Sequence, residues 1–371
     1  MATALRALLI CMLSACSNGE RDAVVPHPIS SFSPIVDNAQ ATLELGTPVL
    51  QPSPKGEAYE GVVQFQLDGR YPLANTRLKL EELWVKAEVW LNDMSLGETL
   101  GGSFPAYLSL PEDLQPGSHT LGFRVWGAER KSGLIQGGRR DNNHQQPSIG
   151  PVSLEFAPHS HIQWLTLALE GGNVSAKASV HNAPSDSTVH FRAFLDGIEL
   201  QSLGEARVID GIAEAPPTTW NQALWSPETG GDALFHFEAE LIGGDGLPLD
   251  HLRQLNGLRS VEFMNNELRL NQEPLRIVAV RLEETWKKEG ANLRELLRVG
   301  INALEIHGSY PPEYWLQMAN ESGLLVVVLP RCDGEVFARP EDIDAQITTI
   351  EAQHQDIAHH LLGHPSMLFW T

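Results

Sequence analysis

Leu324-Leu325-Val326-Val327-Val328-Leu329 is an unbroken apolar run that is followed directly by Pro330. A run of this length, rich in valine and closed by a proline, is typical of a strand that is buried on both faces of a parallel sheet. Runs of the same kind lie at 275–280, 301–306 and 367–370. The C-terminal part of the chain is therefore predicted to form a parallel sheet.

Helical patterns separate these apolar runs. The first has Leu293, Leu296 and Leu297 before Gly300, the second has Trp315, Met318 and Ala319 between Pro311-Pro312 and Gly323, and the third has Ile343, Ile347, Ile350, Ile357 and Leu361. Alternating strands and helices predict right-handed crossovers within one sheet. Since a complete (β/α)8 barrel needs roughly 250 residues, we expect the first half of a TIM barrel, with about four strands.

The chain upstream of this region alternates with period two. Between 57 and 156, Ala87, Val89 and Leu91 share one strand face, and a jelly-roll-like β-sandwich is predicted. Between 159 and 262, Val189 and Phe191 begin a similar alternation, which predicts a smaller, immunoglobulin-like β-sandwich.

The N-terminus has the pattern of an export signal. Arg6 precedes an apolar run, and Leu13-Ser14-Ala15-Cys16 is similar to a bacterial lipobox, in which the cysteine thiol takes the lipid. Residues 1–15 are thus expected to be a lipoprotein signal peptide, Cys16 the lipid attachment site, and 16–47 a lipidated tether in the bacterial cell envelope, at the periplasmic face or outer membrane. The alternative is an ordinary secretory signal in which Cys16 is incidental.

Composition excludes some functions. The 371 residues carry 26 Lys and Arg against 47 Asp and Glu, a formal net charge of −21, which disfavours binding to nucleic acid. Of the three cysteines, Cys332 alone would keep a free thiol, so no internal disulfide is expected. His359, His360 and His364 fall on different faces of one predicted helix and its exit, so we expect no metal, and the sequence points to no cofactor.

Several strings resemble glycoside hydrolase family 2, the family of β-galactosidases, β-glucuronidases and β-mannosidases. They are Ala87-Glu88-Val89-Trp90-Leu91-Asn92-Asp93, Gly101-Gly102-Ser103-Phe104-Pro105, Ser148-Ile149-Gly150-Pro151, Leu224-Trp225-Ser226-Pro227-Glu228, Asn302-Ala303-Leu304 and Gly363-His364-Pro365-Ser366. Each string is short, but their order along the chain matches that of the family. Trp225 is interpreted as a packing residue at a domain junction.

The resemblance implies a domain order and a substrate class. It places a sugar-binding-like β-sandwich at 48–157, an immunoglobulin-like β-sandwich at 158–263 and the first half of the barrel at 264–371. It implies retaining hydrolysis of an oligosaccharide or other glycoside, with His307 and His364 near the sugar. A neutral imidazole both donates and accepts hydrogen bonds, which suits sugar hydroxyls. The alternatives are that His364 caps a strand beside Pro365 and that His307 packs.

The chain also departs from the family pattern. The arginine of the second barrel strand falls on Glu305, and Leu361-Leu362-Gly363 replaces the Arg-x-Asn that precedes the His-Pro-Ser string. The acid/base glutamate and the nucleophilic glutamate of the family would both follow Thr371. We therefore assign no catalytic residue within the chain, and we expect no turnover by the chain alone.

Three hypotheses follow for such a chain. It is the N-terminal part of a larger, truncated β-glycosidase; a carbohydrate-binding lipoprotein without catalysis; or a scaffolding lipoprotein, including one with a partner that completes the barrel. An improvised carboxylate pair among Glu283, Glu284, Glu305, Asp333 and Glu335 is disfavoured, since acidic residues are common throughout this chain.

Overall fold

A computed structural model describes most of the chain beyond residue 40. The described residues are 41–54, 58–69, 75–81, 83, 86–100, 105–111, 114–126, 149–283, 293–307, 311, 313–329, 361 and 363–370. The signal peptide, Cys16, residues 16–40 of the predicted tether and Cys332 lie outside these ranges, as does most of the third predicted helix. The predicted tether extends too far, because Ala41–Gly46 forms a strand that pairs with Val152–Ala157. Within these ranges, no helix is both long and apolar enough to cross a membrane.

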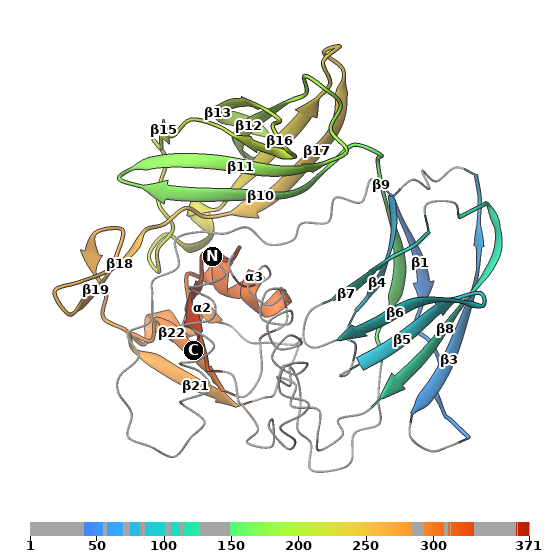
Figure 1. Cartoon of the computed structure of the whole chain (residues 1–371). Helices are drawn as coiled ribbons and strands as arrows, with labels where there is room; N and C mark the ends of the chain where they lie inside the picture. Colours follow the sequence, from blue (N-terminus) through green and yellow to red (C-terminus); the bar gives the residue numbers. More distant parts are fainter. Residues whose placement is uncertain are drawn as a thin grey trace, which may run out of the picture.

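The first β-sandwich consists of two antiparallel sheets (Figure 1). One has the order β1 (Ala41–Gly46), β9 (Val152–Ala157), β4 (Asn75–Leu80) and β7 (Ala106–Ser109). The other has the order β2 (Gln51–Pro52), β3 (Tyr59–Leu67), β8 (Gly117–Trp126), β5 (Lys86–Leu91) and β6 (Met94–Leu100). This confirms the prediction of a sandwich in this part of the chain.

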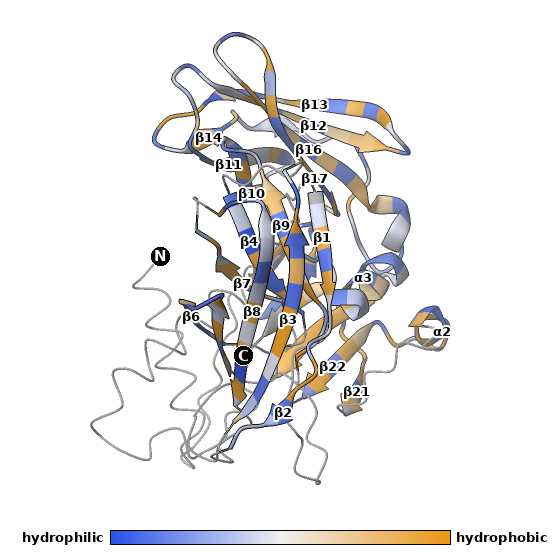
Figure 2. Ribbon diagram, turned by 90° about the vertical axis from the view of Figure 1, so that its right-hand side faces the viewer, coloured by the Kyte–Doolittle hydropathy of each residue, from blue (hydrophilic) through white to orange (hydrophobic). Residues whose placement is uncertain are grey.

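Alternating side chains build the core of the first sandwich. Ala87, Val89 and Leu91 of β5 are buried, and so are Leu121 and Phe123 of the neighbouring β8. The alternation appears as bands of apolar and polar colour along β3 and β8 (Figure 2). These residues belong to a core cluster whose members among the described residues end at Phe156. The first sandwich therefore has its own core.

The second β-sandwich also has two sheets. One comprises β10 (His161–Glu170), β11 (Asn173–His181) and β14 (Ile212–Glu214), with β15 (Thr218–Thr219) also paired to β11. The other has the order β13 (Ile198–Arg207), β12 (Thr188–Leu195), β16 (Phe235–Ile242) and β17 (Pro248–Asn256). The predicted sandwich is confirmed. A short 3₁₀ helix, Gly230–Ala233, directly precedes β16.

A small antiparallel sheet follows the second sandwich. It contains β18 (Val261–Met264), β19 (Glu267–Leu270) and β20 (Glu273–Pro274). The backbone N–H of Leu275 donates to the carbonyl of Leu268 at 2.8 Å and so extends this sheet. This pairing corrects the first predicted strand: the apolar run begins at Leu275, but the parallel strand begins only at Ala279.

The four remaining strands form the predicted parallel sheet. Its order is β21 (Ala279–Glu283), β22 (Ala303–His307), β23 (Leu325–Leu329) and β24 (Met367–Trp370), and all three pairings are parallel. Helix α2 (Leu293–Arg298) lies between β21 and β22 in the chain, and α3 (Glu313–Ser322) lies between β22 and β23. Whether this sheet belongs to a barrel stays a prediction.

The predicted helix ends are confirmed for α2 and α3. Gly300 and Gly323 have φ of +85° and +83°, the left-handed region in which glycine is favoured. The N–H of Gly323 donates to the carbonyl of Ala319 at 2.9 Å, which closes the last turn of α3. Both glycines therefore return the chain from a helix to the next strand.

The two faces of the parallel sheet have different neighbours. Leu304, Ile306, Val326 and Val328 share a cluster with α2 and α3. Ala303, Leu325, Val327 and Leu368, on the opposite face, belong to the core cluster of the second sandwich. The parallel sheet therefore shares a buried cluster with the second sandwich. Helix α3 also contacts that sandwich directly, at the short 3₁₀ helix Gly230–Ala233 (Figure 1).

Candidate functional site

Polar residues gather where the inner face of the parallel sheet leaves the shared core. On β22, Ala303 is fully buried, whereas Glu305 and His307, on the same face, are partly exposed. The neighbouring β21 pairs Arg281 with Glu305, which places Arg281 on this face too. In parallel α/β sheets, ligands bind outside the carboxyl ends of the strands. His307 is the last residue of β22, and Arg281 and Glu305, at the middle of their strands, lie on the face that leads to that end.

Arg281, His307 and Glu305 form a chain of hydrogen bonds. Nη2 of Arg281 donates to Nδ1 of His307 at 2.6 Å, and Nε2 of His307 bonds to Oε1 of Glu305. Because a guanidinium has only donors, Nδ1 must be the unprotonated ring nitrogen, so Nε2 carries the proton and donates to the carboxylate. The imidazole is therefore neutral, with a fixed tautomer and a fixed orientation.

His364 lies elsewhere. It is 4% exposed and precedes β24, so it stands at the amino end of that strand, whereas His307 ends β22. Its Nδ1 lies 2.9 Å from Nδ2 of Asn320, and its Nε2 lies 3.1 Å from Oε2 of Glu313. The structure does not bring His307 and His364 together. The contacts of His364 fit the alternative in which it caps β24, and its contact with a sugar stays a prediction.

Two groups of residues were not identified from the sequence. Arg281 directly follows the apolar run that ends at Val280, so a charged residue at the end of that run was the signal that could have revealed it, although the strand itself continues to Glu283. Asn320 and Glu313 gave no signal, because their partner His364 lies 44 and 51 residues away. Of the carboxylates named above for an improvised pair, Glu284, Asp333 and Glu335 lie outside the described residues.

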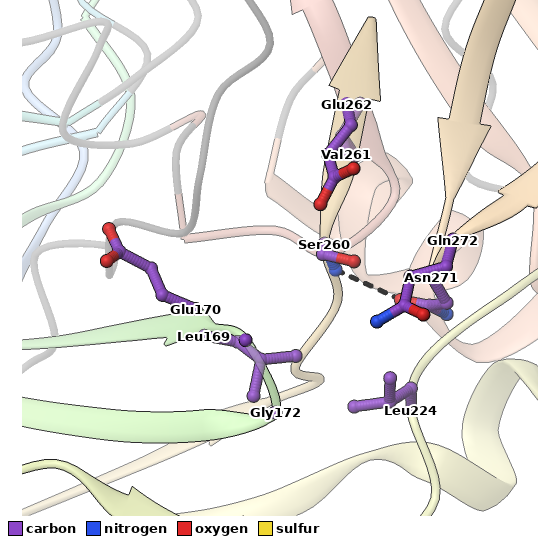
Figure 3. Close-up of a pocket in the computed structure, with 10 residues that line it drawn as sticks. Leu169, Glu170, Gly172, Leu224, Ser260, Val261, Glu262, Asn271 and Gln272 are labelled. Carbon is purple, nitrogen blue, oxygen red and sulfur yellow. Dashed lines mark hydrogen bonds between the residues drawn. The ribbon is translucent and has the colours of Figure 1, made fainter. Parts of the chain in front are cut away.

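A separate pocket lies between the second sandwich and the small β18–β20 sheet (Figure 3). Its volume is about 260 Å³, and its lining includes Glu170, Glu262, Asn271 and Gln272. Oδ1 of Asn271 accepts from the N–H of Ser260 at 3.0 Å, and its Nδ2 donates to the carbonyl of Trp225 at 2.9 Å. The amide is thus engaged in holding the fold. The lining carries two carboxylates and no cationic side chain.

The chain has two β-sandwiches followed by a parallel α/β sheet, and proteins of this architecture are the ones to compare with it. No family model matches the chain. In sequence it is similar to a provisionally named beta-glucuronidase of Formosa agariphila, at 24% identity over 320 residues. That match covers 80% of this chain but 29% of the relative, so the chain spans about three tenths of the relative's length.

Solved structures show the same fold. The beta-glucuronidase of Ruminococcus gnavus in complex with D-glucuronic acid superposes with a TM-score of 0.68 at 16% identity, covering 92% of this chain and 68% of that one. The same enzyme with an N1-substituted uronic isofagomine gives 0.67 at 15% identity, covering 92% and 69%. The likeness extends through both sandwiches and into the parallel sheet.

Proposed function

We propose that the chain is part of an O-glycoside hydrolase whose sugar site lies at the carboxyl ends of β21 and β22. The observation that carries this proposal is the Arg281–His307–Glu305 group, which combines donors and acceptors suited to sugar hydroxyls at the ligand-binding edge of the sheet. The resemblance of the sequence strings and the relatives named as beta-glucuronidases support the same class. Glucuronides are thus the first glycosides to test.

We further propose that this chain positions the sugar while other residues perform the chemistry. Retaining hydrolysis needs two carboxyl groups about 5–5.5 Å apart, one as nucleophile and one as acid/base. Glu305 already accepts a hydrogen bond from His307, and by the family resemblance both catalytic glutamates would follow Thr371. We therefore expect no hydrolysis of aryl β-glycosides by residues 1–371 alone.

The test compares two preparations on 4-nitrophenyl β-D-glucuronide, glucoside, galactoside and mannoside. One is the 371-residue chain, and the other is the native protein extracted from the membrane of its own host. We expect turnover in a native protein of larger mass and none from the chain alone. Turnover by the purified chain that is lost on Glu305→Gln would contradict the proposal that residues outside this chain perform the chemistry.

The same extraction tests the membrane anchor. The proposal that Cys16 carries a lipid rests on Leu13-Ser14-Ala15-Cys16. An intact mass that begins at Cys16 and includes a lipid is the expected result, and Cys16→Ser should release the protein from the membrane fraction. A secreted, unlipidated protein would show that the signal is an ordinary secretory one.

A glycoside-binding lipoprotein without catalysis is the second candidate, because the same three residues could hold a sugar without hydrolysing it. A native protein of the mass of this chain that binds glycosides without turnover would favour this candidate over a hydrolase. A barrel-completing partner would instead be recovered with the native protein, and hydrolysis would depend on that partner.

A further inference from the structure

Arg281 differs from several ion-paired arginines of the structure in what it binds. Arg77, Arg192 and Arg269 each pair with a glutamate, as expected in a chain with a net charge of −21. The described bond of Arg281 goes to a neutral imidazole instead. Its positive charge is therefore not neutralised by a direct ion pair with any described carboxylate, although it lies next to Glu305 in the sheet.

The guanidinium of Arg281 is nevertheless held in place. His307 accepts a hydrogen bond from Nη2, and Glu305 accepts one from the other side of the same ring. The Glu305 carboxylate polarises the imidazole and so makes Nδ1 a better acceptor. One corner of the guanidinium is thereby fixed while most of its N–H groups have no described partner. A side chain that is exposed and oriented in this way is suited to bind a ligand.

The free edge of a guanidinium matches one kind of ligand group especially well. Its parallel N–H donors meet the two oxygens of a carboxylate in a planar, bidentate arrangement, which a lysine or a hydroxyl cannot reproduce. Neutral sugars offer hydroxyl oxygens but no charge to stabilise Arg281.

We propose that Arg281 binds the carboxylate of an acidic sugar and selects uronic acids over neutral hexoses, with His307 and Glu305 as its positioning residues. This inference rests on the proposed function, because it assigns the ligand of the same strand edge.

The experiment is a calorimetric titration of the 371-residue chain with methyl β-D-glucuronide and with methyl β-D-glucoside. Loss of a hydrogen bond to a charged group predicts that Arg281→Met weakens binding of the glucuronide by about tenfold to a hundredfold and changes binding of the glucoside by about twofold at most. Arg281→Lys keeps the positive charge but loses the paired N–H donors of the guanidinium, so its affinity for the glucuronide should lie between those of the wild type and Arg281→Met.

Arg276→Met is the matched control, since Arg276 is also exposed and lies just before β21, outside the three-residue group. It should change neither affinity.

His307→Gln separates a positioning role from a purely structural one. It should reduce the ratio of glucuronide to glucoside affinity by several fold while the urea midpoint changes little. Equal losses for the two sugars would show that His307 does not act through Arg281.

The outcomes also separate this inference from the proposed function. If both sugars bind and Arg281→Met weakens neither, the role of Arg281 is refuted while the sugar site stands. If methyl β-D-glucoside 6-sulfate binds as tightly as the glucuronide, the selection is for any anion and the carboxylate assignment is wrong. If no sugar binds to the wild-type chain, the proposed sugar site fails and this inference fails with it.

Discussion

The indole Nε1 of Trp225 donates a hydrogen bond of 2.9 Å to the backbone carbonyl of Asn320, which lies 95 positions further along the chain. Trp225 belongs to the core of the second sandwich and is fully buried, whereas Asn320 belongs to α3. The side chain of Asn320 in turn contacts His364 and accepts from the N–H of Ser366 at 3.1 Å. Trp225 is thus linked through one residue to the helix and to the start of β24. This confirms its interpretation as a junction residue.

Trp225→Phe should destabilise the chain. The substitution keeps an aromatic ring but removes the buried donor to Asn320, at a cost of about 1–3 kcal/mol for the unsatisfied carbonyl, with a further contribution from the smaller ring. Urea unfolding followed by far-UV circular dichroism measures the loss.

Trp220→Phe is the matched control for this change. Trp220 also lies in the core of the second sandwich, but its Nε1 makes a 3.4 Å contact with the carbonyl of Ala223 in its own loop. We expect a smaller loss than for Trp225→Phe. Equal losses would mean that ring volume, and not the bond to α3, explains the effect.

Gly323→Ala should be far more harmful than Gly300→Ala. Both glycines have nearly the same positive φ, so each substitution imposes a backbone strain of about 1–2 kcal/mol. A Cβ at Gly300 meets nothing within 4 Å, whereas one at Gly323 would stand 2.5 Å from the carbonyl oxygen of Pro227. Gly323→Ala should therefore cost about 2–5 kcal/mol in total.

Denaturant midpoints of the two alanine variants test this expectation directly. The difference between them isolates the steric contact, because the backbone strain is common to both. Similar midpoints would show that the loop at Pro227 moves away freely, and that the second sandwich and α3 are not tightly packed there.

Acid should weaken the junction between the two sandwiches through His161. Its Nδ1 donates to the carbonyl of Pro158 at 2.9 Å, and its ring centroid lies 5.2 Å from that of His181. Burial lowers the pKa of His161 below 6.5, and His181 and Arg77 act in the same direction, against the Pro158 carbonyl and the Asp250 carboxylate. The folded state therefore favours the neutral ring.

The sign of the pH dependence follows from this lowered pKa. Near pH 6.5 the unfolded chain binds more protons than the folded one, so stability is fully present above that pH and is lost as the pH falls through the pKa of the folded state. His161→Gln should lose less stability than the wild type between about pH 7.5 and about pH 5. His236, whose pKa is also lowered by burial, contributes equally to both proteins. If the urea midpoints of the two proteins fall by the same amount over this pH range, the role of His161 is contradicted.

Arg259→Met should be tolerated. The guanidinium is 6% exposed, donates to the carbonyl of Met367 and lies 5.9 Å from the ring of Trp225, while Nη1 has no hydrogen-bond partner among the described residues. Burial lowers the pKa of Arg259 to about 9, so the group is charged at neutral pH without a described counter-ion. Because methionine fills a similar volume without that desolvation cost, the change in unfolding free energy should stay within about 1 kcal/mol.

Arg259→Ala serves as the comparison for this substitution. It removes the same charge but leaves a cavity, with an expected cost of about 2–4 kcal/mol. Urea unfolding of both variants measures the difference. A loss of more than about 2 kcal/mol in the methionine variant would show that the bond to Met367 outweighs the desolvation of the charge.

The sequence was most informative where burial dictates residue type. Leu325–Leu329 and Met367–Trp370 are apolar on both faces because one face packs with α2 and α3 and the other belongs to the buried cluster that includes the second sandwich. The start of β21 could not be read in the same way, because Leu275 pairs with Leu268 in another sheet. Hydrophobicity shows that a segment is buried, but it does not show which strand becomes its neighbour.

The candidate site was harder to predict than the fold. His307 was selected because it ends a predicted strand, and the structure places it at that end. His364 was selected on the resemblance to the family, yet its ring contacts α3 through partners far away in the sequence. Arg281 acquires its orientation from His307, 26 positions away, a pairing that appears only when two strands lie side by side.

The shared core also bears on how such a protein could evolve. Ala303, Leu325, Val327 and Leu368 belong to the same buried cluster as the interior of the second sandwich, whereas the described core of the first sandwich forms a separate cluster. A gene rearrangement that exchanged the parallel sheet alone would expose apolar surface on both resulting pieces. Recombination should therefore preserve the second sandwich and the parallel sheet as one inherited module, while the first sandwich can be replaced or can diverge independently.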